Sequence, residues 1–557
     1  MERACVHGRW TAYVIGIAVG ALTMLAVPRA HAGNADASFV AACESFRPSQ
    51  LGEGEAIVST RFQPASQHRP AYCLVRGTIT TSPRSTINYR IDLPETASWN
   101  QKLLVIGGGG YDGYIPLDPS MGVEGFDLWS MFVGYQGPNL GSYVLVGSDS
   151  GHQGRGPLPA FDTTWTAENP DAVTNYAYRA NHLVLSAAVN VSQKFYGREP
   201  QRRYMVGGSN GGRQGIMAAT RYPDDYHGIF SAFPALSIAG FLASWPPIYD
   251  HIYESPENWL NPDALALFVN SEVAACDELD GVKDGVIGNY KACKFNAASL
   301  ACPEGREIDP KRCLTPGQIE TVRLVRSYKQ FDFPLAAGLR GYPGYGPGAV
   351  TSAWNIFILG SNWVARDAFS YIILSHGLRW FTNDPNANPI GFDVNKSRDA
   401  FAKYSALLDP TPRDLGPFFA KGGKMIIWHG VGDTIVSYER TEEFVDLVQK
   451  ELGADTTRKS LRYFVSPTLD HYFDGPEANS VPILAKLEDW VEKSKAPDSV
   501  IATRLDPPDG VGLIMSKSSL GNRKVAFTRP LCEYGTFPKY NGRGDSTKAS
   551  SFTCSKP

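Results

Sequence analysis

Residues 204–219 read YMVGGSNGGRQGIMAA, and this stretch decides the fold. Its apolar start predicts a short strand, and the residues after Gly212 predict a helix. Residues 207–211 fit the pattern G-x-S-x-G, in which small residues tolerate a sharp turn that lifts Ser209 above a sheet. A plain glycine–serine turn is one alternative. A dinucleotide-binding loop is another, but the G-x-G-x-x-G spacing is missing. The strand before Ser209 and the helix after it favour a reactive serine.

The rest of the chain alternates strand and helix patterns around this motif. Apolar runs predict strands at 101–106, 143–147 and 424–428, and helical patterns occupy 175–196 and 441–452. Such alternation predicts an α/β fold with a mostly parallel sheet covered on both faces.

The pattern changes between about residues 236 and 415, where Pro and Gly are frequent and periodicity is weak. We therefore expect residues 33–235 to form the first part of the core and 236–415 an inserted lid domain. Residues 416–557 would form the second part of the core and a C-terminal tail. An insertion above a sheet commonly carries substrate contacts. After residue 500 the chain is polar, and we expect it to be irregular.

The composition is that of a folded globular protein: 557 residues, 43% hydrophobic and 20% charged, with a formal net charge of -3. Basic residues are spread along the chain, which argues against nucleic acid as a partner.

The first 32 residues have the pattern of an export signal. Arg3 and Arg9 precede an apolar stretch, 11–27, and Ala30-His31-Ala32 offers a cleavage site. A membrane anchor is the alternative, but the apolar run is short and interrupted by glycines. We expect a secreted or periplasmic protein with no membrane partner after the signal is removed.

Nine cysteines are present, and one of them, Cys5, lies in the signal. An even number in an exported chain favours disulfides. A zinc site is disfavoured because there is no CxxC pair and no histidine at ligand spacing. Eight cysteines allow 105 connectivities. The simplest joins sequence neighbours: Cys43–Cys73, Cys276–Cys293, Cys302–Cys313 and Cys532–Cys554.

A serine hydroxyl needs an adjacent base, and in the α/β-hydrolase fold the partners follow in the order Ser, acid, His. Asp433 follows the strand candidate 424–428 through a glycine-rich turn, at the sheet edge where active sites gather. His471 is the one histidine after Asp433. A helix-capping role is the alternative for Asp433. His429 precedes Asp433 and is interpreted as a packed core residue.

An acyl-transfer site also needs two N–H donors aimed at the oxyanion. One would be the amide of Asn210, directly after the serine. The other would come from Gly109 or Gly110, because a glycine run after an early strand lets the backbone approach the substrate. Glycine as loop filler is the alternative, and the sequence does not decide between the two residues.

Together these segments resemble the tannase and feruloyl esterase family over nearly all of the mature chain. The resemblance is carried by the glycine run with Tyr111-Asp112-Gly113, by 148–152 (SDSGH), by 176–180 (YAYRA), by 208–213 (GSNGGR), and by 428–430 (WHG) with Asp433 and His471. It implies an α/β-hydrolase core with a lid and hydrolysis of aromatic acid esters, as in tannases, feruloyl and chlorogenate esterases and a mono(hydroxyethyl) terephthalate hydrolase.

The resemblance also implies a structural calcium ion in the lid. Asp277, Asp280 and Asp284 would bind it with their side chains, and Val282 and Val286 with their carbonyls. Carboxylates at close spacing, separated by glycines, suit a hard cation. A solvated acidic turn is the alternative, and the spacing is not that of an EF-hand.

One departure stands out. The family usually has a cysteine directly before the serine and another directly after the histidine, joined as a disulfide, where this chain has Gly208 and Tyr472. Both cysteines are absent together, so no orphan thiol remains.

We therefore expect a secreted esterase for small aromatic acid esters, such as ferulates or gallates. An esterase for aliphatic or terephthalate-type synthetic esters on the same scaffold is a second hypothesis. A catalytically inactive secreted binding protein is a third. The sequence names neither the acid, the alcohol nor the oligomeric state.

Overall fold

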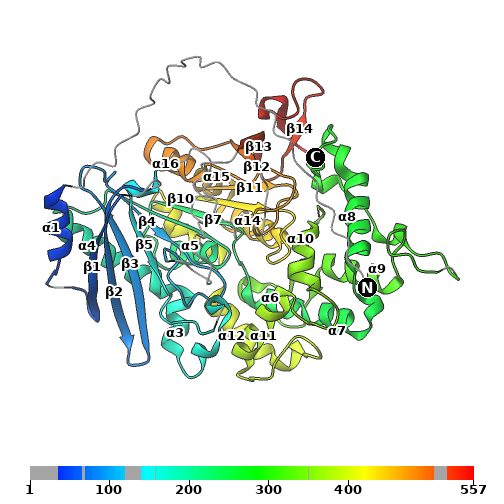
Figure 1. The fold of residues 1–557 in the computed structure, drawn as a ribbon, viewed down its shortest axis with the longest axis horizontal. Coiled ribbons are helices and arrows are strands. Elements are labelled where there is room, and N and C mark those ends of the chain that lie inside the picture. The colour runs from blue at the N-terminus through cyan, green and yellow to red at the C-terminus, as the bar shows by residue number, and fades with distance from the viewer. Residues whose placement is uncertain are drawn as a thin grey trace, which may run out of the picture. The chain divides into compact units, whose positions relative to one another are not determined.

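A mixed sheet of eleven strands organises the chain (Figure 1), in the order β1-β2-β3-β5-β4-β6-β7-β10-β11-β13-β12. This computed structural model describes residues 36–49, 51–65, 69–118, 139–156, 158–305, 307–348, 350–506 and 524–557. The strands of the sheet are β1 (Glu55–Gln63), β2 (Tyr72–Ser82), β3 (Ser85–Pro94), β4 (Lys102–Ile106), β5 (Val144–Ser148), β6 (Arg202–Gly208), β7 (Gly228–Ala232), β10 (Lys424–Gly430), β11 (Leu461–Ser466), β12 (Ser499–Asp506) and β13 (Lys524–Glu533).

The six central strands, from β5 to β11, are parallel, and antiparallel strands flank them on both sides. This confirms the α/β-hydrolase fold class. One expectation is wrong: the chain after residue 500 is not an irregular tail, because β12 and β13 pair with each other and β13 pairs with β11. A further hairpin, β14 (Phe537–Tyr540) with β15 (Phe552–Ser555), follows them.

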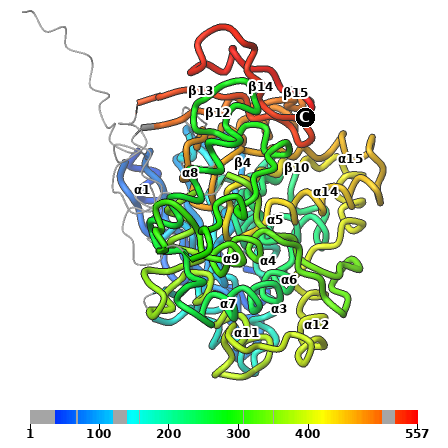
Figure 2. The backbone as a smooth tube through the Cα atoms, turned by 90° about the vertical axis from the view of Figure 1, so that its right-hand side faces the viewer, coloured from blue at the N-terminus to red at the C-terminus, as the bar shows by residue number. Residues whose placement is uncertain are grey.

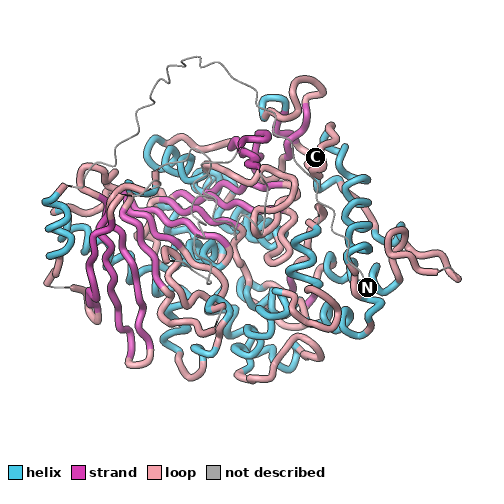
Figure 3. The backbone as a smooth tube through the Cα atoms, viewed as in Figure 1, coloured by secondary structure: helices cyan, strands magenta, loops and turns pink. Residues whose placement is uncertain are grey.

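Helices cover both faces of the sheet because its strands alternate their side chains between two apolar cores. Met205 and Ile427 face the core formed with α4 (Ala180–Tyr196), α5 (Asn210–Arg221) and α14 (Tyr438–Leu452). Tyr204 and Trp428, their sequence neighbours, face the opposite core formed with α16 (Ile483–Lys493). Figure 3 shows the helices packed along the strands.

In the described part of the segment between β7 and β10, no strand joins the eleven-stranded sheet. The helices of this segment include α6 (Ile238–Ser244), α7 (Pro246–Glu254), α8 (Pro262–Cys276), α9 (Pro316–Arg326), α11 (Phe369–Thr382) and α12 (Arg398–Leu408). A short pair of strands, β8 (Lys329–Gln330) and β9 (Gly341–Tyr342), lies among them. Figure 2 shows α7, α8 and α9 together on one side of the chain. These helices bury an aromatic-rich core of their own.

Four disulfides form, and all four join the sequence neighbours that we expected: Cys43–Cys73, Cys276–Cys293, Cys302–Cys313 and Cys532–Cys554. Each closes a loop of 11 to 30 residues. Short loops of this kind restrict the unfolded chain and typically stabilise the fold by about 2–4 kcal/mol each.

The expected signal, residues 1–32, lies outside the described residues. Among the residues that are described, no helix has the length and apolar character needed to span a bilayer.

Candidate active site

Ser209 lies at the sharp turn between β6 and α5, as the motif predicts. Its backbone has φ 57° and ψ −124°, a conformation that side chains rarely adopt and that here is held from both sides. The Ser209 amide donates to the Ala232 carbonyl at the end of β7 (3.0 Å), and its carbonyl accepts from the amide of Ala235 (3.1 Å). A Cβ on Gly207 would lie 2.5 Å from the Gly211 backbone, so this turn requires glycine on its flank.

Asp433 and His471 come from the loops that follow the neighbouring strands β10 and β11, and the structure brings them together. Nδ1 of His471 lies 2.6 Å from Oδ2 of Asp433. The other carboxylate oxygen, Oδ1, accepts from the amides of Ile435 (2.8 Å) and Val436 (2.9 Å). Both side chains are buried, with Asp433 1% and His471 7% exposed. The imidazole is therefore held in one orientation.

His429 is buried as expected, and it has a second contact that the sequence did not indicate. Its Nε2 lies 3.2 Å from Oδ2 of Asp433, while its Nδ1 lies 2.8 Å from the Thr441 hydroxyl. Burial alone would raise the pKa of Asp433. Electrostatic attraction to His471 and hydrogen bonds from His429 and His471 outweigh it and hold that pKa below its usual range. Asp433 is thus kept ionised.

Phe233 connects the serine turn to the histidine. It directly follows Ala232, which accepts the Ser209 amide, and its own amide donates to the Trp428 carbonyl (2.6 Å). The Phe233 ring packs against the imidazole of His471 with centroids 5.1 Å apart. The Ser209 turn is thus bonded to Ala232, and the ring of the next residue, Phe233, packs on the imidazole of His471.

The glycine run reaches the same site. Gly110 and Asn210 line one pocket together with Ser209, and Gly110 has a positive φ of 57°. A Cβ on Gly109 would lie 3.2 Å from the Tyr114 hydroxyl oxygen. Gly110 therefore lies near the first turn of α5.

The pocket beside Ser209 is mainly apolar and aromatic. Its walls include Tyr111, Tyr176, Phe241 and Tyr342. The three phenol groups are already engaged: Tyr111 donates to the Ile373 carbonyl (3.1 Å), Tyr176 donates to the Gly110 carbonyl (3.0 Å), and Tyr342 accepts the Ser437 amide (3.2 Å). No charged side chain occurs among the described residues that line it.

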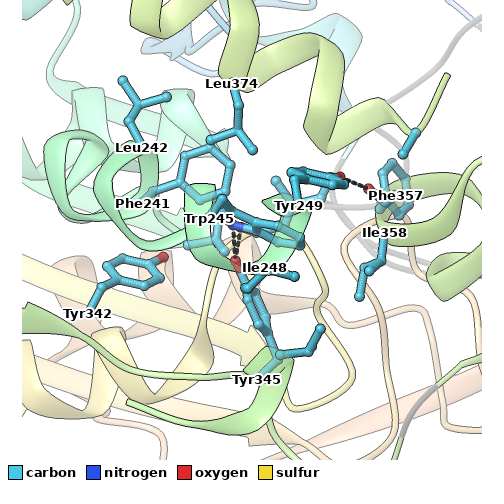
Figure 4. Packing of buried hydrophobic residues seen from close by; sticks show 14 of the residues in the cluster. Phe241, Leu242, Trp245, Ile248, Tyr249, Tyr342, Tyr345, Phe357, Ile358 and Leu374 are labelled. Atoms are coloured by element: carbon cyan, nitrogen blue, oxygen red, sulfur yellow. Dashed lines mark hydrogen bonds between the residues drawn. The ribbon is translucent and has the colours of Figure 1, made fainter. Parts of the chain in front are cut away.

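The inserted segment supports this wall from behind (Figure 4). Trp245 donates from its indole to the Tyr345 hydroxyl (2.8 Å), and Tyr249 donates to the Phe357 carbonyl (3.3 Å). The Phe241 ring packs against the rings of both Trp245 and Tyr342 in this cluster. The pocket wall is therefore a packed aromatic surface with fixed hydrogen bonds.

Tyr472 occupies the place of the cysteine that the family usually has after the histidine. Its ring stacks on Phe357 of the inserted segment, with centroids 5.1 Å apart and planes 6° apart. The same ring lies 5.5 Å from that of His471. Packing between aromatic rings thus ties the histidine loop to the inserted segment.

The acidic segment of residues 277–286 follows α8. Asp277 accepts from the amides of Asp284 (3.2 Å) and Gly285 (3.1 Å), and Asp280 accepts from that of Val282 (3.1 Å). Asp284 forms an ion pair with Arg529 of β13. Burial raises the pKa of Asp280 to about 7, and the charges of Asp284 and Asp277 add to that rise.

In that arrangement the carboxylates are close enough to repel one another, which a hard cation would relieve. Within the described ranges, however, no group of three or more His, Cys, Asp or Glu side chains is arranged to hold a metal. The Val286 carbonyl, expected as a ligand, accepts the Gly288 amide (2.9 Å). Calcium therefore stays a prediction.

Sequence reasoning missed Asp112 as a functional candidate. It is fully buried, and its Oδ1 accepts from Nδ2 of Asn210 (2.6 Å), the residue directly after Ser209. Burial raises its pKa to about 6. Asp112 belongs to a segment that was quoted for the family resemblance, and a charged residue two positions after a glycine run was the signal that could have found it.

Residues 73–555 match the family described as tannase and feruloyl esterase. An uncharacterized esterase of Agrobacterium fabrum is 32% identical over 510 residues, which cover 88% of this chain and 86% of that protein. A probable feruloyl esterase B-2 of Aspergillus flavus is 27% identical over 540 residues, covering 89% of this chain and 96% of that protein.

Solved structures share the fold. The crystal structure of feruloyl esterase B from Aspergillus oryzae covers 93% of this chain and 100% of its own, with a TM-score of 0.76 and 24% identity. Tannin acyl hydrolase from Aspergillus niger covers 93% of this chain and 94% of its own, with a TM-score of 0.66 and 19% identity. The chain therefore belongs to the tannase and feruloyl esterase family, a family of carboxylic ester hydrolases.

Proposed function

We propose that this protein is a serine esterase in which Ser209 is the nucleophile, His471 the base and Asp433 the acid that orients it. The observation that carries the proposal is the 2.6 Å contact between His471 and Asp433, on the loops that follow β10 and β11, beside the strained turn of Ser209. Such a contact fixes the proton on Nδ1 and leaves Nε2 free to take a proton from a serine hydroxyl.

In the proposed reaction, His471 Nε2 accepts the Ser209 proton as Oγ attacks the ester carbonyl carbon. The backbone N–H of Asn210 and that of Gly109 or Gly110 stabilise the oxyanion of the tetrahedral intermediate. The intermediate collapses, His471 gives its proton to the departing alcohol, and an acyl-enzyme remains. Water, deprotonated by His471, then releases the acid and restores Ser209.

The pocket supports an aromatic acyl group as substrate. Aromatic walls favour a flat ring, and the described residues of the lining provide no cation for a free carboxylate. This favours neutral aromatic acids over a terephthalate half-ester, whose second carboxylate would be buried without a partner. Ferulic and gallic esters are the candidates that the family relatives suggest.

We further propose that the inserted segment, residues 236–415, acts as a lid over this pocket and carries a structural calcium ion at residues 277–286. Four disulfides support an extracellular or periplasmic location, because such bonds persist in oxidising compartments.

The test combines an active-site probe with a substrate panel. A fluorophosphonate should label the wild type at Ser209 and should not label Ser209→Ala. Methyl ferulate, methyl gallate, an aliphatic acetate ester and a terephthalate half-ester would then be compared by kcat/KM. Near wild-type turnover by pure Ser209→Ala would refute the nucleophile. Aliphatic esters as the best substrates would support the second hypothesis, and no labelling or turnover at all would support a binding protein.

A further inference from the structure

One buried carboxylate connects the two sides of the proposed oxyanion site. Oδ1 of Asp112 accepts from Nδ2 of Asn210 (2.6 Å) at the first turn of α5. Its Oδ2 accepts from the Ser150 hydroxyl, after β5, and from the side-chain amide of Gln214, one turn further along α5. Three donors from two different segments therefore converge on one side chain that is 0% exposed.

The same residue shapes the glycine run that follows β4. The Asp112 amide donates to the Gly109 carbonyl (2.9 Å), which closes a turn in which Gly110 and Asp112 both have positive φ, 57° and 48°. A Cβ on Gly108 would lie 3.0 Å from the Asp112 carboxyl group, so carboxylate and loop backbone are in contact. Gln214 completes a ring of contacts, because its Oε1 accepts the Gly108 amide (3.3 Å).

We propose that Asp112 is a positioning residue for the oxyanion hole. Its side chain holds the Gly109–Gly110 loop and the Asn210 turn at a fixed separation. The inference rests on the proposed function. Asp112 does not touch the reacting atoms in this proposal; it acts through the backbone N–H groups on both sides. Oxyanion donors are effective because they are preorganised, so loosening their separation should lower the rate more than it lowers substrate binding.

The chemistry of the side chain explains why a carboxylate is placed here. Its partners Asn210 Nδ2, Ser150 Oγ and Gln214 Nε2 all donate, and an ionised carboxylate is a side chain that only accepts. Arg213, also fully buried, donates from Nε to the side-chain oxygen Oδ1 of Asn210 (2.7 Å) and supplies compensating positive charge. An asparagine at 112 would have the same shape but would direct N–H groups at a donor.

The experiment compares Asp112→Asn with the matched control Asp149→Asn. Asp149 is also a buried aspartate at the end of β5, 2% exposed, and accepts from the amides of Asn88 (3.0 Å) and Gly151 (2.9 Å). It makes no hydrogen bond to Asn210 or to the glycine run among the described residues. Melting temperature, kcat and KM for an aryl ester, and inhibition by phenylboronic acid would be measured for both variants and the wild type.

Phenylboronic acid forms a tetrahedral adduct with a reactive serine and so reports on the oxyanion hole. For Asp112→Asn we expect kcat to fall roughly 10- to 100-fold and boronate affinity to fall by a similar factor, with KM changed less than about threefold. Asp149→Asn should leave kcat and boronate affinity within about threefold of the wild type, even if its melting temperature falls as much as that of Asp112→Asn.

If Asp112→Asn does not fold, Asn210→Ala keeps the backbone N–H of residue 210 and removes one of the three donors. For Asn210→Ala we then expect kcat and boronate affinity to fall as well, but by a smaller factor. Wild-type kcat and boronate affinity in whichever variant folds would overturn the inference, as would equal losses in the Asp149 control. A wild type that hydrolyses no ester would overturn the proposed function and this inference with it, whereas a fully active Asp112→Asn overturns only the inference.

Discussion

Replacement of Asp433 by asparagine should move the ring proton of His471 from Nδ1 to Nε2 without changing the shape of the site. Oδ1 of Asp433 accepts two backbone amides, from Ile435 and Val436, at 2.8 and 2.9 Å. These donors are part of the main chain and cannot turn away. The asparagine must therefore direct its carbonyl oxygen to them and its NH₂ group to His471.

An NH₂ group facing Nδ1 of His471 donates to it, so the ring proton moves to Nε2. In that tautomer Nε2 can no longer accept the proton of Ser209. The change of tautomer at such a site typically costs about 10⁴ in kcat, which corresponds to about 5 kcal/mol of barrier at 1.36 kcal/mol per factor of ten. Because the volume is unchanged and the hydrogen bonds of Oδ1 persist, the melting temperature should fall by much less than catalysis does.

The assay is steady-state hydrolysis of an aryl ester by Asp433→Asn, with Asp470→Asn as control. Asp470 lies in the same loop as His471, is 1% exposed, and accepts from the amides of Tyr472 (2.9 Å) and Asp474 (2.7 Å). The control loses a buried carboxylate beside the imidazole but leaves the contact with Asp433 intact, so it should retain at least about a tenth of kcat. A folded Asp433→Asn with kcat within tenfold of the wild type would refute the assignment of Asp433.

Three further predictions concern metal, pH and the missing disulfide. Chelation should lower the melting temperature of the wild type, and added calcium should restore it, because a ligand that binds only the folded state stabilises that state by mass action. Asp280→Asn should show neither effect. An unchanged melting curve and no calcium by metal analysis would mean that the segment is a plain acidic turn. The free energy of unfolding should fall as pH rises from about 5 to 8. Buried aspartates whose pKa values are raised to about 6 or 7 keep protons in the folded state that the unfolded chain has already released. Those residues are Asp112, Asp149, Asp409 and Asp470. Calorimetry at both pH values would contradict this if the melting temperature were higher at pH 8. Gly208→Cys combined with Tyr472→Cys should form a bridge if the two Cα atoms lie about 4.4–6.8 Å apart, and free thiols in the oxidised double variant would count against His471 as the base.

The central fold was predictable because its signals are local. The run 204–206, the turn at Ser209 and the following helix combine apolar periodicity with a turn that requires glycine, and each signal spans a few residues. Asp433 and His471 could be chosen because the chain order of the fold restricts the candidates.

The flanking strands were harder, because their evidence is not local. β12 and β13 mix apolar and polar residues, and they gain their place because they pair with each other and β13 pairs with β11. Such pairing depends on residues far apart in the chain, which composition does not reveal. The roles of Asp112 and His429 were missed for a related reason: each depends on a contact that exists only once separate loops meet at the same end of the sheet.

The place of the insertion also has an evolutionary consequence. β7 and β10 are parallel neighbours, so the whole segment between them leaves and rejoins the sheet at adjacent strands. It supplies Ile238, Phe241, Tyr342 and Ile373 to the pocket, whereas Ser209 comes from the sheet itself. Substitutions in the insertion can therefore reshape one side of the proposed acyl pocket, while Tyr111, Tyr176 and Ser209 on the core side stay unchanged. Such a division lets the preference for one ester over another change separately from the proposed catalytic residues.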